Sequence, residues 1–226
     1  MKKRPLLMAI KPRELYKVIK KLFFVTQSLY QLPFFASFCY LTGARISEAL
    51  AVRKRDISFE EDCIVVNLRT LKHKDFNVVR QIPIAPIKID KPFYKLVYDY
   101  LVDNIDTLKE DEPIWFQFVF KTRWLINKYF KKVRFKVLML DEEKKQWVEG
   151  EWHLFPHYLR HCRASHLVAH FNFREYELMK FMGWVDSDSA KFYIKLDYRD
   201  LLKKMYQADM VLELFNRYLR EEYVKS

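Results

Sequence analysis

The stretch Thr42-Gly43-Ala44-Arg45-Ile46-Ser47-Glu48-Ala49-Leu50 marks the point where one helical run of the chain ends and another begins. Gly43 permits a tight turn, because glycine enters backbone conformations that other residues avoid. After the turn, Ile46 and Ala49 fall on one face of a short helix. Arg45 then points away from that face, near a helix N-terminus, where a guanidinium beside free backbone N–H groups suits a phosphate oxygen. A surface arginine on an ordinary helix would give the same pattern.

The segments on both sides of this stretch alternate between helix-like and strand-like patterns. Residues 12–40 carry apolar residues at helical spacing and predict two helices, and residues 46–51 continue the pattern. Two short β-branched runs predict an antiparallel hairpin, residues 63–68 with 78–84, whose turn contains Lys72, His73 and Lys74. The later elements are predicted in this order: helices at about 93–101 and 123–132, a hairpin of 134–140 with 146–154, and helices after Pro156.

These elements follow one another without an internal repeat, a low-complexity tract or a Pro/Ser-rich linker. With 226 residues, half of them hydrophobic, the chain is long enough to bury a core. We therefore expect a single domain over residues 1–226. Its expected class is α+β, mostly α-helical, with a small antiparallel sheet.

The charge balance indicates an anionic partner. Lysine and arginine number 41 against 29 aspartate and glutamate residues, a formal charge of +12, which favours nucleic acid or a membrane surface. No stretch approaches the ~18 to 20 continuous apolar residues of a membrane span, and no signal-peptide pattern follows the first four residues. Nucleic acid is therefore the expected partner, and no membrane is expected.

Several residue types argue against cofactor chemistry. Cys39, Cys63 and Cys162 are odd in number and widely spaced, so they favour a reducing, intracellular setting over a disulfide framework or a zinc ribbon. With only three glycines, the chain has no Gly-rich phosphate loop. The acidic clusters at 60–62 and 141–143 lack a histidine or further carboxylate at ligand spacing and fit solvated turns. No cofactor or metal is expected.

A second motif, Pro156-His157-Tyr158-Leu159-Arg160, begins a helix, since proline is favoured in the first helical turn. His157 and Arg160 are three residues apart and share a face. They could bring an imidazole for proton transfer and a guanidinium for phosphate charge to one point. A solvated or core histidine beside a surface arginine would explain the string equally well.

A third motif spans residues 178–193. Residues 178–182 predict an apolar helix that Gly183 ends as a C-cap, and residues 186–189 can cap the next helix. Trp184 and Tyr193 thereby stand at the two ends of a short turn and helix. The chain is 17% aromatic and has 14 tyrosines, so neither residue is distinguished by type alone.

In this order, the motifs resemble the tyrosine recombinases, also called phage integrases. Members of that family present an arginine in a T-G-x-R-x-S-E string, a hairpin lysine, H-x-x-R, a Gly-His or Gly-Trp pair, and then a tyrosine. The chain has each of these in the same order: Thr42–Glu48, the hairpin lysines, His157–Arg160, Gly183-Trp184 and Tyr193. The resemblance covers residues from about 10 onward and implies the family's catalytic-domain fold.

The resemblance also implies a role for each motif residue. Arg45 and Arg160 would hold the scissile DNA phosphate while Tyr193 attacks phosphorus, giving a 3′-phosphotyrosyl link and a free 5′-hydroxyl. His157 would be the base, since a phenol with a pKa near 10 is a poor nucleophile at neutral pH. Trp184 would position the phosphate, because an indole N–H donates a hydrogen bond but cannot carry a proton.

A hairpin lysine would protonate the departing 5′ oxygen. Lys72 is preferred over Lys74 because it closely follows Thr70 at the end of the first strand, and Lys74 would then contact phosphate. The implied chemistry needs neither a metal ion nor ATP.

Two further segments bear on partners. A basic run suits a DNA backbone, although a solvated helix face explains it as well: Lys121, Arg123, Lys128, Lys131, Lys132, Arg134 and Lys136. Apolar residues from Leu201 to Leu219 predict one stripe on a C-terminal helix. The stripe suits burial against its own domain, and the resemblance suggests docking on a neighbouring protomer in a tetramer on double-stranded DNA.

The implied function is site-specific recombination, as an integrase of a virus or mobile element. Trp184 stands where many members have histidine, and only 44 residues precede Arg45, so the DNA-binding domain that usually comes first is not expected. Two alternatives stay open. One is an enzyme like the nicking tyrosine topoisomerases, which share the Arg, Lys, Arg and Tyr chemistry, and the other is a basic DNA-binding protein that has lost catalysis.

Overall fold

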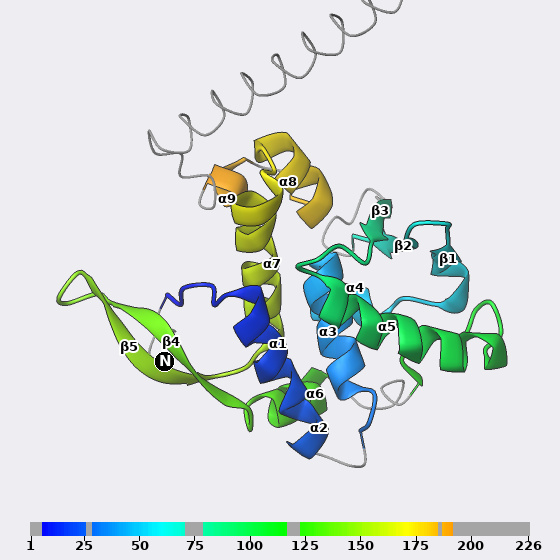
Figure 1. The fold of residues 1–226 in the computed structure, drawn as a ribbon, viewed down its shortest axis with the longest axis horizontal. Helices are drawn as coiled ribbons and strands as arrows, with labels where there is room; N and C mark the ends of the chain where they lie inside the picture. The colour runs from blue at the N-terminus through cyan, green and yellow to red at the C-terminus, as the bar shows by residue number, and fades with distance from the viewer. Residues whose placement is uncertain (1–5, 26–28, 71–78, 117–122, 185–186, 192–226) are drawn as a thin grey trace, which may run out of the picture.

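Helices and two small antiparallel sheets make up the part of the chain that the computed structural model describes (Figure 1). The described residues are 6–25, 29–70, 79–116, 123–184 and 187–191. The predicted class, α+β and mostly α-helical, is confirmed. Within these ranges, no helix combines the length and apolar character that crossing a membrane requires.

The helix α3 (Leu32–Thr42) lies at the centre of the packing. All of its residues except Phe34 are buried, as expected for a helix that is apolar all round. It packs against α5 (Lys91–Asn104) and α7 (Pro156–Phe171), which lie near it in Figure 1. Its C-terminal end therefore lies among elements from distant parts of the sequence.

The two helices predicted over residues 12–40 are three in the structure. Ahead of α3, α1 (Pro12–Lys20) and α2 (Leu22–Val25) are separated at Lys21. The Lys21 N–H donates to the carbonyl of Val18, three residues earlier, which tightens the last turn of α1.

The first predicted hairpin is confirmed and belongs to a three-stranded antiparallel sheet. Its strands are β1 (Ile57–Phe59), β2 (Ile64–Arg69) and β3 (Val79–Ile84), in the order β1-β2-β3. Val66 of β2 faces Ile57 on one side and Ile82 on the other. Alternate residues of β2 and β3 are buried. The predicted turn with Lys72, His73 and Lys74 lies outside the described residues.

The second predicted hairpin is also confirmed, as β4 (Arg134–Asp141) paired with β5 (Gln146–His153). Asp141 ends β4 and accepts hydrogen bonds from the next turn's backbone, at 3.1 Å from the amides of Glu143 and Lys144. The N-terminal residues Leu6–Met8 run along the other edge of β4. In Figure 1 the hairpin projects from the helices.

The remaining described elements are short helices and turns: α4 (Ile46–Leu50), η1 (Lys54–Asp56), η2 (Ile105–Thr107), α6 (Arg123–Phe130), α8 (Glu175–Met182) and α9 (Asp188–Lys191). The predicted helices in these regions are confirmed up to Lys191, and the predicted helical tail beyond it lies outside the described residues. Gly183 ends α8 in the left-handed conformation, with φ +63°, as its C-cap assignment required.

Candidate functional site

The turn from Thr42 to Arg45, between α3 and α4, is the point around which the candidate site is built. Thr42 fixes the turn from within, because its hydroxyl donates to the Phe38 carbonyl at 2.7 Å and accepts from the Ala44 N–H at 3.2 Å. Gly43 has φ +61°, and a Cβ there would lie 2.8 Å from Met182 Sδ. The turn therefore requires glycine both for its backbone and for its contact with the end of α8.

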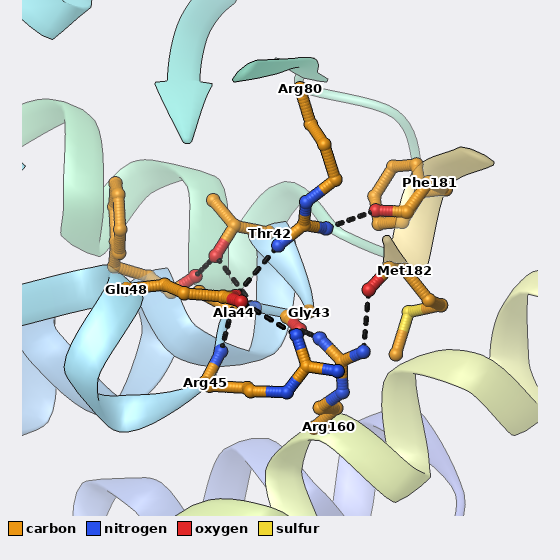
Figure 2. Close-up of polar contacts among 10 residues, drawn as sticks. Thr42, Gly43, Ala44, Arg45, Glu48, Arg80, Arg160, Phe181 and Met182 are labelled. Atoms are coloured by element: carbon orange, nitrogen blue, oxygen red, sulfur yellow. Dashed lines mark hydrogen bonds and ion pairs between the residues drawn. The ribbon is translucent and has the colours of Figure 1, made fainter. Parts of the chain in front are cut away.

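Arg45 is the N-cap residue of α4, and Glu48 holds both its backbone and its side chain. The Arg45 N–H donates to Glu48 Oε2 at 2.9 Å, and Arg45 Nη1 lies 2.6 Å from Glu48 Oε1 (Figure 2). The Arg45 side chain is 25% exposed, whereas that of Glu48 is fully buried. Arg45 thus presents a partly accessible guanidinium whose direction a buried carboxylate sets.

Arg160 reaches the same turn from α7. Its Nη1 donates to the Gly43 carbonyl and its Nη2 to the Met182 carbonyl, so one side chain joins the turn to the end of α8 (Figure 2). Arg160 is only 3% exposed, so the alternative reading of the second motif, a histidine beside a surface arginine, is wrong for this arginine. Its guanidinium carbon lies 5.6 Å from the centre of the Trp184 ring, which directly follows Gly183.

A third arginine, Arg80 of β3, belongs to the same cluster and was missed in the sequence. Its Nη2 lies 2.7 Å from Glu48 Oε2, and its Nη1 donates to the carbonyl of Phe181 (Figure 2). Burial lowers the pKa of the Arg80 guanidinium, Glu48 acts in the opposite direction, and Arg45 adds to the lowering. Glu48 is therefore shared by two arginines.

One signal could have revealed this cluster. Arg80, Ile82 and Ile84 occupy alternate positions of β3, so they share the buried face of the strand. A charged residue in an otherwise apolar stripe needs a buried partner of opposite charge. The alternation along β3 thus indicates that Arg80 is buried beside a carboxylate, and the structure shows that this carboxylate is Glu48.

The two histidines of the second motif have different surroundings. His157, the second residue of α7, is exposed, and His161 lies one helical turn later. Burial lowers the pKa of His161 to about 4, and the nearby His157 adds to the lowering. The structure thus brings Arg45, Arg160 and Trp184 together and places His157 on the exposed first turn of α7.

Several of the predicted site residues cannot be placed relative to this cluster. Lys72, Lys74, Lys121 and Tyr193 lie outside the described residues. The described members of the basic run are all exposed: Arg123, Lys128, Lys131 and Lys132 lie on α6 and the turn after it, and Arg134 and Lys136 lie on β4. Figure 1 shows α6 beside α2 and toward the opposite end of the molecule from α8, so the cations of α6 form a separate surface.

Comparison with known families and sequences gives one match. The model of the phage integrase family matches residues 11–200. A search of curated protein sequences finds no match.

Solved structures share the fold at low sequence identity. The XerH site-specific recombinase bound to its difH substrate superposes with a TM-score of 0.58 at 14% identity, covering 91% of this chain and 55% of that chain. The XerA recombinase gives 0.54 at 16% identity, covering 92% and 66%. The Tn1549 transposon integrase in complex with a circular intermediate DNA gives 0.57 at 16% identity, covering 90% and 67%. The chain thus spans between half and two thirds of the length of these proteins.

Proposed function

Because the chain belongs to the phage integrase family, we propose that it is a site-specific DNA recombinase that cuts and rejoins double-stranded DNA through Tyr193. The observation that carries the proposal is the meeting of Arg45 and Arg160 at one turn. Residues more than a hundred positions apart in the sequence place two guanidinium groups beside Gly43, and Trp184 lies against the second. Two arginines so arranged suit a phosphodiester with two non-bridging oxygens.

The proposed reaction is a transesterification at a DNA phosphate. The Tyr193 oxygen bonds to phosphorus while the bond from phosphorus to the 5′ oxygen breaks, leaving a 3′-phosphotyrosyl link. His157 accepts the phenol proton, and Lys72 gives a proton to the departing 5′ oxygen. Attack by the 5′-hydroxyl of another strand reverses these steps and rejoins the DNA, so the phosphotyrosyl bond conserves the energy of the phosphodiester.

Arg45 and Arg160 contribute electrostatic stabilisation. Negative charge grows on the non-bridging oxygens as Tyr193 attacks, and preorganised guanidinium groups neutralise it without reorganising at that moment. Arg45 is held by Glu48 and Arg160 by two backbone carbonyls, which is the kind of support that preorganisation requires. Removing one such contact typically costs about 10²–10³ in rate.

The proposed substrate and assembly follow the family. The XerH structure contains its difH substrate and the Tn1549 structure a circular intermediate DNA, and a formal charge of +12 suits a DNA polyanion here. We propose a tetramer assembled on double-stranded DNA inside the cell. Integration of the DNA of a virus or mobile element is the proposed natural role.

The test is capture of the covalent intermediate. The full chain is incubated, with a metal chelator present, with short duplexes of randomised central sequence that carry a nick in each strand. After cleavage next to a nick, the short 5′-hydroxyl fragment diffuses away and the protein stays attached. A denaturing gel should then show a protein–DNA adduct, and sequencing the attached DNA identifies the site.

Two tyrosine variants decide what the adduct means. Tyr193→Phe should form none, whereas Tyr176→Phe should form it normally, because Tyr176 is a 75% exposed residue of α8 with no proposed role. An adduct that persists in Tyr193→Phe would move the nucleophile elsewhere. Retention of DNA in a native gel without any adduct would support a protein that binds DNA but does not cut it.

A further inference from the structure

We propose that Arg80 is a positioning residue for the reaction. It fixes the positions of Glu48, Arg45 and the Gly183-Trp184 pair relative to the phosphate. This inference rests on the proposed function. It starts from the contacts of one buried side chain that joins three separate elements: β3, α4 and the end of α8.

The Arg80 side chain is 4% exposed, and its two Nη groups are bonded to Glu48 and to the Phe181 carbonyl. We infer that it acts by holding Glu48, which in turn holds the partly exposed Arg45. Its Nη2 lies 2.7 Å from Glu48 Oε2, the same oxygen that accepts the Arg45 N–H at 2.9 Å. Arg80 and the Arg45 backbone therefore hold one carboxylate oxygen between them, which leaves Oε1 for the Arg45 guanidinium.

At its other end, Arg80 is fitted against the turn that precedes Trp184. Its Nη1 donates to the Phe181 carbonyl, and a Cβ on Gly183 would lie 2.7 Å from Arg80 Cδ and Nε. The Arg80 side chain fits in this position because Gly183 has no side chain. Because Trp184 follows directly and lies against Arg160, the position of Arg80 affects both members of that pair.

An arginine is needed for this arrangement because two acceptors in different elements must be reached at once. The planar guanidinium presents separate Nη groups to Glu48 and Phe181, whereas a lysine has a single Nζ on a flexible stem.

Loss of Arg80 should change the electrostatics as well as the geometry. Glu48 would then have Arg45 as its only guanidinium partner among the described residues, and would hold it more tightly. The cluster would also lose one positive charge close to the proposed phosphate site. Both effects weaken stabilisation of the transition state more than they weaken overall DNA binding, which depends on the many phosphate contacts of the surface.

The chain offers a matched control in Arg163. This α7 residue is also buried and also ion-paired, with its Nη1 2.7 Å from Asp90 Oδ2 and side-chain exposures of 5% and 2%. Asp90 precedes α5 and has no proposed role in the reaction. A merely structural contribution should therefore appear equally in Arg80→Met and Arg163→Met.

The experiment measures the single-turnover rate of adduct formation at saturating nicked DNA, DNA affinity by native gel, and the folded fraction by denaturation. Arg80→Met should lower the cleavage rate per folded molecule on the order of tenfold to hundredfold, with nearly unchanged affinity. Arg80→Lys should recover part of the rate. Arg163→Met should keep the wild-type rate per folded molecule, even where it lowers stability.

A double-mutant cycle with Arg45→Lys tests whether Arg80 acts through Arg45. Substitutions of residues that share a partner have non-additive effects. Arg80→Met should therefore lower the cleavage rate clearly less in the Arg45→Lys background than in the wild type. A wild-type rate in Arg80→Met would overturn the inference, and should that variant not fold, a wild-type rate in Arg80→Lys would do so. Failure of the wild type and Arg163→Met to form any adduct would instead reject the proposed function, and this inference with it.

Discussion

At the scale of single residues, Arg45 and Arg160 should respond differently to substitution although both face the same phosphate in the proposed reaction. Arg160→Ala should lower the cleavage rate by about 10²–10³ and also destabilise the fold, because the buried carbonyls of Gly43 and Met182 lose their donor. Arg45→Ala should lower the rate similarly with a smaller loss of stability, since its side chain is 25% exposed.

The two effects are separated by measuring adduct formation and urea denaturation on the same preparations. Arg53→Ala is the control, because Arg53 is a 47% exposed arginine paired with an exposed aspartate and should change neither quantity. Equal rates for wild type and Arg45→Ala would remove Arg45 from the site.

Gly183 gives a second prediction at this scale. Gly183→Ala should destabilise the fold by roughly 1–3 kcal/mol, since alanine would be forced to a positive φ and its Cβ would meet Arg80. Gly150→Ala is the comparison, because Gly150 has no positive φ and its Cβ would meet only the flexible end of Met139. A larger loss for Gly150→Ala in denaturation curves would contradict this explanation.

The site residues that belong to a recognisable sequence motif could be predicted from the sequence. The buried contacts that hold these residues in place could not. Arg45, Arg160 and Trp184 belong to short motifs with fixed spacing, and the structure brings them together. Arg80 and Glu48 form a pair 32 positions apart, and only the register of β3 brings them together. A pattern read along one strand can show that Arg80 is buried, but it does not show which carboxylate it meets.

At the scale of elements, the hairpins were predictable because β-branched and aromatic runs lie on either side of polar turns. The strand β1 was not predicted, since three residues carry too short a pattern and Ile57 is held by its pairing with Val66. The break between α1 and α2 was also missed in the sequence. Lys21 suits a helix by composition, and tertiary packing decides where the helix stops.

The helix α7 should make the fold sensitive to acid through His166. Its Nδ1 lies 2.9 Å from the Tyr40 hydroxyl and its Nε2 lies 2.9 Å from the Ile10 carbonyl, so one ring joins α3, α7 and the N-terminal segment. Burial lowers the pKa of His166 to about 4, the Ile10 carbonyl acts in the opposite direction, and further lowering comes from three neighbours: His170, Arg163 and His161.

Because the folded-state pKa of His166 lies below the unfolded value of about 6.5, the neutral ring favours the fold. Its contribution is complete above about pH 6.5 and is lost as the pH falls toward about 4, amounting to roughly 2 kcal/mol by about pH 5. Urea denaturation at about pH 7 and pH 5 should show a smaller drop in stability for His166→Gln than for the wild type. An equal drop in the two proteins would contradict the prediction.

At the scale of the whole molecule, one cluster of buried apolar residues extends from Leu7 to Ala190. This continuity supports the proposal that the described residues belong to one domain. The partly exposed Arg45 begins α4, whereas the exposed cations of α6 belong to a separate element that lies toward the end of the molecule away from α8 (Figure 1).

The cations of α6 and the turn after it should determine how salt weakens DNA binding. Each lysine that neutralises a phosphate releases counterions, so Lys131→Ala with Lys132→Ala should reduce the slope of log affinity against log salt by about 1 to 2. The cleavage rate at saturating DNA should not change. Lys95→Ala, at an exposed lysine of α5 paired with Asp99, is the control, and a slope identical to its own would remove this surface from the DNA interface.

The central claim is that Tyr193 is the nucleophile, and the position of the trapped DNA on the protein tests it most directly. The adduct is trimmed with nuclease, digested with trypsin and analysed by mass spectrometry. The nucleotide remnant should be joined through its 3′ phosphate to Tyr193, in the peptide Phe192-Tyr193-Ile194-Lys195. A remnant on Tyr198, Tyr206 or any other residue, or one joined through a 5′ phosphate, would contradict the proposed mechanism.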